Sequence, residues 1–416
     1  MVTFFKKYAS SGWKIDKKYI CCFLIPFILL LIVQCTNPEP EKRQILPEKS
    51  QKRKNFDYLS LFIALPQNVK SPSDNAQSPE KVQLGKLLFY DPILSGEKDV
   101  ACATCHHPSN GYAEYRDLSI GSNGRGLGSE RVFNKPNKIP LVKRNAPTIL
   151  NVAFNGINTT NQYTPESAPM FWDLRINSLE SQALLPILTY EEMRGTHFSE
   201  DQILSEIIKR LKNIPKYVSL FKAAYGGSCD INAENIAKSI AAFERTLITP
   251  NTRFDRFLRG DADAISLAEK EGFRLFKKVG CGNCHNGPMF SDYQPHILGV
   301  PKNPELLEMD KGIKDTYAFR TASLRNLRFT APYMHNGSFN SLKEVLEFYE
   351  DMADGKSRLE EVTKQQFDPL ISELKLSVKE MEPIISFLNS LNDADYDKSI
   401  PTSVPSGLNI AGNIKP

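Results

Sequence analysis

Two Cys-x-x-Cys-His motifs carry the clearest chemistry in this 416-residue chain. They comprise Cys102, Cys105 and His106, and Cys281, Cys284 and His285. In such a turn, the two cysteines can form thioether bonds with the vinyl groups of one haem, and the histidine lies beneath the iron. A zinc site is the alternative, but a closed zinc site needs four ligands. Because the motifs are far apart and each has its own histidine, the sequence predicts two covalently bound haems c.

The positions of the remaining histidines and methionines restrict which residues can serve as the second axial ligand of each iron. Residues 108–169, which follow the first motif, contain neither residue type. Electron-transfer haems fill both axial positions, whereas a catalytic haem keeps one open. The sequence therefore predicts an open, reactive first haem. Among the other histidines, His107 and His197 receive no role.

The N-terminus has the pattern of an export signal. A lysine-rich start precedes an apolar run at 20–33, which is short for a membrane span. We interpret residues 1–35 as a lipoprotein signal with Cys35 as the lipidated residue, and residues 36–56 as a tether. Gln34 stands where a small residue is expected, so an uncleaved anchor is the alternative. Either reading predicts a periplasmic or cell-envelope protein with a membrane tether at its N-terminus.

Charge excludes one class of partner. The formal net charge is +4, and lysines within residues 1–34 carry this excess. The rest of the chain is close to neutral, so no basic face is expected and nucleic acid is not a predicted partner. Cys229 stands apart from both motifs, and we assign it no role.

Helix signals dominate the pattern along the chain. Ser78 caps a helix beginning at Pro79, and Ser266 with Glu269 forms a capping box for another. The stretches that lead to the two motifs resemble each other, which indicates a distant duplication. No alternating strands are evident. We expect a mainly α fold of two cytochrome c-type haem domains packed around a shared interface, with long loops. The predicted helices lie at 201–213, 232–247 and 377–391. The predicted domains are an N-terminal haem domain at 57–262 and a C-terminal haem domain at 263–395, followed by a tail at 396–416.

From about residue 60 to 395, the chain resembles the bacterial di-haem cytochrome c peroxidase family, which includes the MauG-type enzymes. The resemblance rests on the two haem motifs and on further runs in the same order: Arg144-Asn145-Ala146-Pro147-Thr148, Phe171-Trp172-Asp173, Ala242-Phe243-Glu244-Arg245-Thr246-Leu247, Leu324-Arg325-Asn326 and Thr330-Ala331-Pro332-Tyr333-Met334-His335. It implies that the N-terminal haem reacts with hydrogen peroxide and the C-terminal haem handles electrons.

The resemblance also implies roles for single residues near the reactive haem. Gln182, Pro186 and Glu192 match the spacing of the family's distal pocket, where Glu192 would move a peroxide proton and Gln182 would hydrogen-bond the bound oxygen. Without the family, Glu192 would be read as a solvated carboxylate. Trp172 matches a tryptophan on the electron path between the haems, whereas a lone tryptophan is more often a core residue.

Further positions match binding sites of the family. Asn145, Thr330 and Pro332 match residues that hold a calcium ion between the haems through an amide oxygen and backbone carbonyls. His296 and His335 match recurrent histidines, to which we assign structural or propionate-contact roles.

Two departures from the ordinary peroxidases are informative. Tyr349 stands where those enzymes place a methionine ligand of the second haem, and MauG-type enzymes have tyrosine there. Met334 and Met352 are alternative ligands. The histidine that blocks the reactive haem in many family peroxidases is also missing. The enzyme is therefore expected to be active without reductive priming.

The leading functional prediction is a peroxidase that reduces hydrogen peroxide with electrons from a small cytochrome c or cupredoxin. One alternative is a MauG-like oxidase that modifies a partner protein, although Val279 stands where MauG has a tryptophan. The other is a non-catalytic electron-transfer cytochrome. The sequence does not decide between a monomer and a homodimer.

Overall fold

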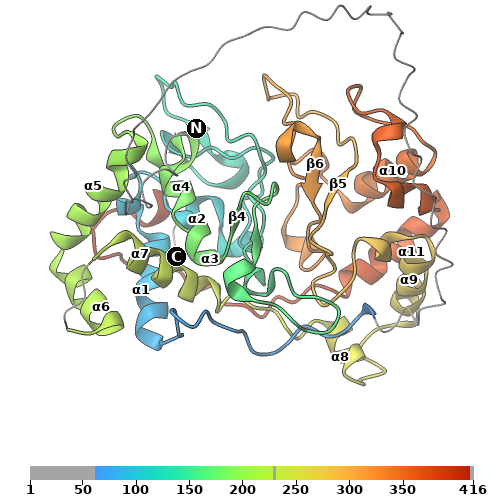
Figure 1. Ribbon diagram of the computed structural model, residues 1–416, viewed down its shortest axis with the longest axis horizontal. Helices are drawn as coiled ribbons and strands as arrows, with labels where there is room; N and C mark the ends of the chain where they lie inside the picture. Colours follow the sequence, from blue (N-terminus) through green and yellow to red (C-terminus); the bar gives the residue numbers. More distant parts are fainter. Residues whose placement is uncertain (1–60, 228–230, 413–416) are drawn as a thin grey trace, which may run out of the picture. The chain divides into compact units, whose positions relative to one another are not determined.

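The computed structural model describes residues 61–227 and 231–412 (Figure 1). Within these ranges the fold is mainly helical with long irregular connections, which confirms the predicted fold class. The signal segment with Cys35, the tether at 36–56, and Cys229 lie outside the described residues. No helix in the described ranges is long and apolar enough to cross a membrane.

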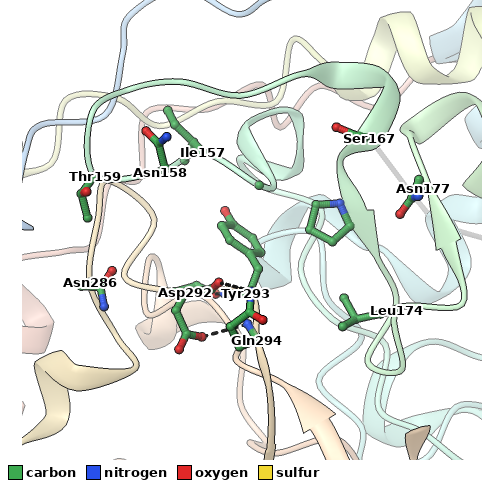
Figure 2. Close-up of a pocket in the computed structure, with 13 residues that line it drawn as sticks. Ile157, Asn158, Thr159, Ser167, Leu174, Asn177, Asn286, Asp292, Tyr293 and Gln294 are labelled. Carbon is green, nitrogen blue, oxygen red and sulfur yellow. Dashed lines mark hydrogen bonds between the residues drawn. The ribbon is translucent and has the colours of Figure 1, made fainter. Parts of the chain in front are cut away.

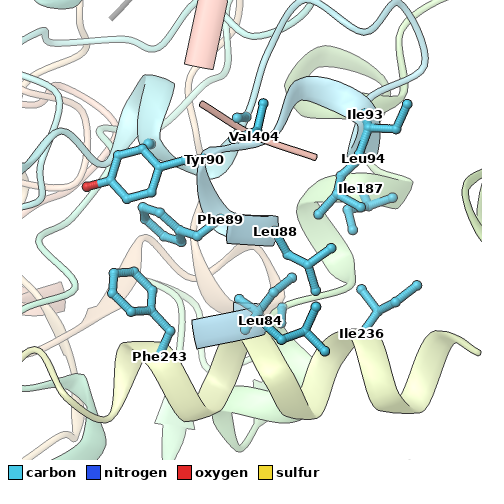
Figure 3. Packing of buried hydrophobic residues seen from close by; sticks show 14 of the residues in the cluster. Leu84, Leu88, Phe89, Tyr90, Ile93, Leu94, Ile187, Ile236, Phe243 and Val404 are labelled. Atoms are coloured by element: carbon cyan, nitrogen blue, oxygen red, sulfur yellow. The ribbon is translucent and has the colours of Figure 1, made fainter. Parts of the chain in front are cut away.

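One helix pair supports the first haem motif. Helix α1 (Pro79–Tyr90) begins where predicted, because the Ser78 side chain accepts a hydrogen bond from the Lys81 amide. It packs on α7 (Ala233–Glu244), and Figure 3 shows Leu84, Leu88 and Phe89 of α1 against Ile236 and Phe243 of α7. Close approach depends on Gly85, since a methyl group there would collide with the Ser239 carbonyl. The pair therefore holds the chain that leads into Cys102.

A second pair repeats this arrangement before the second motif. Helix α9 (Leu267–Lys278) has the predicted capping box between Ser266 and Glu269, and it packs on α11 (Val378–Asn389). Gly272 occupies the position equivalent to Gly85, and a methyl group there would collide with the Pro383 carbonyl. The resemblance between the two approach sequences thus corresponds to two similar helix crossings, one in each half of the chain (Figure 1).

Replacing Gly272 by alanine is expected to destabilise the protein by about 1–3 kcal/mol, the usual cost of overpacking a close contact. The added methyl group meets backbone rather than a movable side-chain end. Denaturant unfolding of the haem-loaded protein measures the change. Gly227→Ala is the control, because nothing lies within 4 Å of a Cβ there. Equal stability of the two variants would contradict the tight crossing.

The other elements are shorter or differ from expectation. The predicted helices 201–213 and 377–391 match α5 (Glu200–Lys212) and α11 to within two residues, whereas the helix predicted over 232–247 ends at Glu244.

The sequence also predicted no strands, and this was wrong for three antiparallel pairs of two or three residues each, which are too short to show alternation. The pairs are β1 (Gly124–Arg125) with β2 (Val132–Phe133), β3 (Pro169–Met170) with β4 (Ile176–Asn177), and β5 (Pro295–Ile297) with β6 (Ala318–Arg320). The remaining α-helices are α2 (Cys102–Cys105), α3 (Leu179–Gln182), α4 (Leu185–Leu188), α6 (Pro215–Tyr225), α8 (Arg253–Leu258) and α10 (Leu342–Ala353).

The segment after α11 returns to the first half of the protein. Ser406 donates a hydrogen bond of 2.6 Å to Asp91, and Val404 and Ala411 are buried in the core around α1. Thr104, which lies between the two cysteines of the first motif, donates to the Ala411 carbonyl at 3.0 Å. The predicted tail is therefore packed on the first haem motif, while the predicted boundary between the two haem domains stays a prediction.

Candidate active site

Both Cys-x-x-Cys-His motifs have the geometry of a haem attachment. In each, the histidine Nδ1 faces a backbone carbonyl: His106 lies 3.1 Å from the Tyr112 oxygen and His285 lies 2.9 Å from the Phe290 oxygen. With the proton assigned to Nδ1 as donor, each Nε2 keeps its lone pair for a metal. Burial lowers the pKa of both histidines, which favours the neutral, ligating form.

The cysteines of these motifs complete the fit. Cys102, Cys105, Cys281 and Cys284 are free thiols, and none is consumed by a disulfide. The first pair lies on the single helical turn α2, and the second begins on the 3-10 turn η8 (Cys281–Asn283). Two thiols and one oriented imidazole are the donor set that a c-type haem requires. The residues present therefore fit one haem at each motif.

Glu192 lies near the cysteines of the first motif. It belongs to a π-helical turn, η7 (Tyr190–Arg194), which is fixed because the Glu192 carbonyl accepts a 2.8 Å hydrogen bond from the Ser122 amide. Burial raises the pKa of both Cys102 and Cys105, and the negative charge of Glu192 adds to the rise in each. The fold thus places the predicted acid–base residue close to both haem thiols.

The environment of Glu192 suits proton transfer. Burial raises the pKa of its carboxyl group to about 7, while Arg175 lowers it and Glu191 raises it further. A group with this pKa can accept and return a proton near neutral pH. Gln182 ends α3 and Pro186 lies in α4, which packs directly against η7. The three predicted distal residues therefore belong to consecutive short turns.

Two further glutamates near the first motif were missed by sequence analysis. Burial raises the pKa of Glu114 to about 7 and that of Glu244 to about 8. Their charges act on Cys105 and Cys102, respectively. Glu244 belongs to the family run at 242–247, which was a usable signal, whereas nothing in the sequence marks Glu114 as buried. The first motif is thus surrounded by carboxyl groups that gain protons easily.

Tyr349 lies beside the second motif. It is on α10, a helix that the sequence analysis did not predict. Burial raises the pKa of its phenol well above the ordinary value, and charges at Cys284 and Cys281 add to the rise. Tyr349 packs against two hydrophobic clusters, one that includes Cys281 and a neighbouring one that includes Met334 and Met352 but neither cysteine. Of the three candidate ligands, only the tyrosine shares a cluster with a cysteine of the second motif.

Trp172 joins the two halves of the molecule. Its indole Nε1 donates to the Asn145 carbonyl at 3.0 Å, and its own carbonyl accepts from the Arg320 amide at 2.8 Å. The Asn145 amide in turn donates to the His335 carbonyl at 2.7 Å. These bonds place the predicted relay tryptophan in contact with residues from both the first and the second half of the chain.

One of these bonds links a predicted calcium position to the segment that holds the others. Asn145 lies against His335, at the end of the run that contains Thr330 and Pro332. Its side-chain nitrogen donates to the Arg116 carbonyl at 2.8 Å, so the side-chain oxygen stays available as a ligand. One amide oxygen and nearby backbone carbonyls are ligands that calcium accepts.

The other histidines have contrasting environments. His296 bridges two carboxylates, with Nδ1 at 2.7 Å from Asp368 and Nε2 at 3.0 Å from Asp292. Burial acts to lower the pKa of His296, but hydrogen bonds with Asp292, Cys284 and Asp368 raise it to about 11. His335 is buried with its ring stacked 3.6 Å from that of Phe319, and burial lowers its pKa to about 3. His296 is therefore cationic and His335 neutral.

The two unassigned histidines make local contacts. His107 Nδ1 accepts a 3.2 Å hydrogen bond from the Ser109 amide, which caps a short turn. His197 is largely exposed and pairs with Glu97. These contacts account for both residues as structural groups.

A cavity of about 540 Å³ lies next to the second motif. Figure 2 shows its wall, which is formed by the segment following His285 and by residues of the first half of the chain. The lining is rich in amide and hydroxyl groups and includes the carboxylate that binds His296; its labelled members include Asn158, Thr159, Ser167, Asn177, Asn286, Asp292 and Gln294. The cavity therefore offers both polar and apolar groups beside the second motif.

Two sites that each fit a c-type haem, carried on two similar helix crossings, define a di-haem cytochrome. Comparison with known proteins shows to which family of di-haem cytochromes the chain belongs. The profile of the di-haem cytochrome c peroxidase family matches residues 79–263. The chain is 34% identical to the methylamine utilization protein MauG of Methylorubrum extorquens over 331 residues, which cover 78% of this chain and 82% of that protein. The chain belongs to the di-haem cytochrome c peroxidase family, which implies two c-type haems.

Other relatives agree with this assignment. The cytochrome c551 peroxidase of Pseudomonas aeruginosa is 31% identical over 344 residues, covering 80% of this chain and 84% of that protein. Among solved structures, a MauG-like protein associated with microbial copper homeostasis aligns with a TM-score of 0.63 and 27% identity. That alignment covers 79% of this chain and 95% of the other.

Proposed function

We propose that this protein is a peroxidase that reduces hydrogen peroxide to water with electrons from a small redox protein. The observation that supports this most strongly is Glu192, a partly buried residue whose desolvated carboxyl group has a pKa of about 7 and whose charge acts on the thiols of the first motif. A bound haem would supply an iron that takes up peroxide and exchanges electrons. Conversion of one peroxide to two waters also requires two protons, and the chain provides the groups that handle them.

The residues around the first motif divide this work. With a haem bound at the first motif, the Glu192 carboxylate would accept a proton from one peroxide oxygen and return it to the other, which would leave as water. The Gln182 amide donates a hydrogen bond that orients the peroxide, and Pro186 keeps the adjoining turn free of a backbone donor. Trp172 would conduct electrons between the two haem positions, and Tyr349 would help to hold the second haem.

A stopped-flow experiment tests the proposal. The haem-loaded protein is mixed with hydrogen peroxide, with and without a reduced cytochrome c or cupredoxin. We expect stoichiometric oxidation of the donor, two electrons per peroxide. Peroxide consumption that leaves both donors reduced would exclude this function.

A MauG-like oxidase is the second candidate function, and the placement of Tyr349 beside Cys281 and Cys284 favours it. Val279, which is 3% exposed, stands where MauG has a tryptophan for long-range oxidation of its substrate. This argues for the peroxidase. Peroxide-dependent modification of a co-purifying protein, with no oxidation of small donors, would favour the MauG-like oxidase over the peroxidase.

The proposal includes a calcium ion between the haem positions, held by the Asn145 side-chain oxygen and the carbonyls of Thr330 and Pro332. We expect elemental analysis to find about one calcium per chain, and much less in Asn145→Ala. A purified wild-type protein free of calcium would contradict this site.

The proposal also places the protein in the cell envelope, lipid-anchored through Cys35. Membrane fractionation of wild type and Cys35→Ser tests the anchor, and release of the variant into the soluble fraction is the expected result. If Cys35→Ser stays in the membrane fraction, an uncleaved N-terminal helix is the anchor instead.

A further inference from the structure

Tyr112 lies directly against the proximal side of the first haem motif. Its backbone carbonyl is the acceptor that faces His106 Nδ1, at 3.1 Å. Its ring is fully buried, and its hydroxyl donates to the Asp397 carbonyl at 2.7 Å. An oxidisable phenol therefore belongs to the residue whose backbone carbonyl faces the histidine that would hold the reactive iron.

A second phenol continues from Tyr112 toward the surface. The ring of Tyr396 is centred 6.0 Å from that of Tyr112, at an angle of 60°. Its hydroxyl donates to the Pro108 carbonyl at 3.0 Å, and the side chain is partly exposed. Tyr396 belongs to the C-terminal segment that packs on the first half of the protein. The two tyrosines thus lead from the first haem motif to a partly exposed side chain.

Neither phenol has a role in peroxide reduction as described above. Other aromatic rings touch the pair, with Phe89 centred 6.2 Å from Tyr112 and Phe329 centred 6.3 Å from Tyr396. A phenylalanine has no hydroxyl proton to release and is far harder to oxidise than a phenol. Among these four rings, only the two tyrosines can be oxidised in this way. The phenol of Tyr90 also interacts with that of Tyr112, but Tyr90 is fully buried, so Tyr396 is the phenol of this group that is partly exposed.

We propose that Tyr112 and Tyr396 form a second electron path, which discharges oxidising equivalents from the first haem site to the surface when no electron donor is bound. This inference rests on the proposed peroxidase function. Its purpose is protective, because an oxidant held in a buried site without reductant attacks its own pocket. The path ends at a partly exposed side chain, where solvent reductants can reach the radical.

The electrons and protons of this process balance. Each tyrosine that is oxidised loses one electron and its phenolic proton and becomes a neutral phenoxyl radical. The first oxidation ends on Tyr396, because an electron passes from Tyr396 to Tyr112 as Tyr112 is oxidised. A second oxidation then leaves a radical on Tyr112. Together they give two electrons and two protons, which convert one hydrogen peroxide into two waters.

Protons have acceptors along the route. The partly exposed Tyr396 hydroxyl can release its proton to water. Tyr112 is buried, and its hydroxyl contacts the backbone carbonyl of Asp397. The carboxylate of the same residue can accept the proton of Tyr112. Burial acts to raise the pKa of Asp397, but hydrogen bonds from Lys86 and Ser399 hold that pKa below its usual range. The carboxylate is therefore present at neutral pH.

Spin-trap mapping tests the path. The haem-loaded protein is treated with hydrogen peroxide and a nitroso spin trap without any electron donor, and peptides are analysed by mass spectrometry. We expect the adduct on Tyr396 in the wild type, none at this position in Tyr396→Phe, and a marked loss of the Tyr396 adduct in Tyr112→Phe. Tyr225→Phe is the matched control, since this partly buried tyrosine of α6 is remote in sequence from the motif, and it should leave the adduct unchanged.

The outcomes separate this path from the enzyme's main activity. Donor-supported turnover should be the same in Tyr396→Phe and wild type, with normal haem content and circular dichroism. A wild type that consumes peroxide normally but carries no adduct on Tyr396 would overturn the path alone. An unchanged Tyr396 adduct in Tyr112→Phe would overturn it too, because oxidant would then reach Tyr396 by diffusion. Failure to react with peroxide at all would instead overturn the proposed function.

Discussion

Replacing Glu192 by glutamine is expected to slow peroxide reduction by about 10²–10⁴-fold, the usual contribution of one positioned acid–base group. Glutamine keeps the size of the side chain but cannot accept the proton from peroxide. The second-order rate constant with peroxide, measured by stopped-flow absorbance, is the direct readout. Glu191→Gln is the matched control, because it removes the neighbouring carboxylate and leaves Glu192 in place.

The pH profile sharpens this prediction. Burial brings the pKa of Glu192 to about 7, so the carboxylate that accepts the proton forms as pH rises through that value. The rate constant of the wild type should therefore rise with pH through about 7 and level off above it. This titration should disappear in Glu192→Gln. An unaffected rate, or the same titration in the variant, would remove Glu192 from the mechanism.

Replacing Tyr349 by methionine is expected to raise the midpoint potential of the second haem by on the order of 0.1 V or more, within the roughly 0.8 V range that axial ligands cover. An anionic phenolate stabilises ferric iron, whereas a neutral thioether favours the ferrous state. Potentiometric titration followed by absorbance measures the shift, and Tyr349→Phe should also change the spectrum.

Met352→Leu serves as the control for this substitution. Met352 is buried in a cluster that contains neither cysteine of the second motif, so its loss should leave the potential of the second haem in place. If Met352→Leu moved the potential and Tyr349→Met did not, the ligand would be the methionine.

Local sequence signals predicted the parts of the fold that are set by neighbours in the chain. Ser78 and Ser266 mark helix starts because capping involves only a few adjacent residues. Helix α10 was missed, although Leu342, Leu346 and Tyr349 follow helical spacing. Its omission matters, because this helix carries the candidate ligand of the second haem.

Features that depend on distant contacts could not be predicted in this way. The hydrogen bond from Thr104 to Ala411 joins residues 307 positions apart, so no periodicity reveals it. The raised pKa values of Glu114 and Glu244 likewise arise from burial by the whole fold. In contrast, Glu192 was found from family spacing, and only the structure adds the desolvation that gives its carboxyl group a useful pKa.

The central claim is that two similar motifs hold unequal haems. Glu192 lies near Cys102 and Cys105 of the first, and Tyr349 lies beside Cys281 and Cys284 of the second. We therefore expect an open axial position at the first haem and a tyrosine ligand at the second.

Electron paramagnetic resonance of the oxidised, haem-loaded protein as isolated tests this claim most directly. We predict equal amounts of one high-spin ferric haem, with an open axial position, and one low-spin ferric haem, whose low-spin signal changes in Tyr349→Phe. Two fully low-spin haems in the wild type would contradict the account.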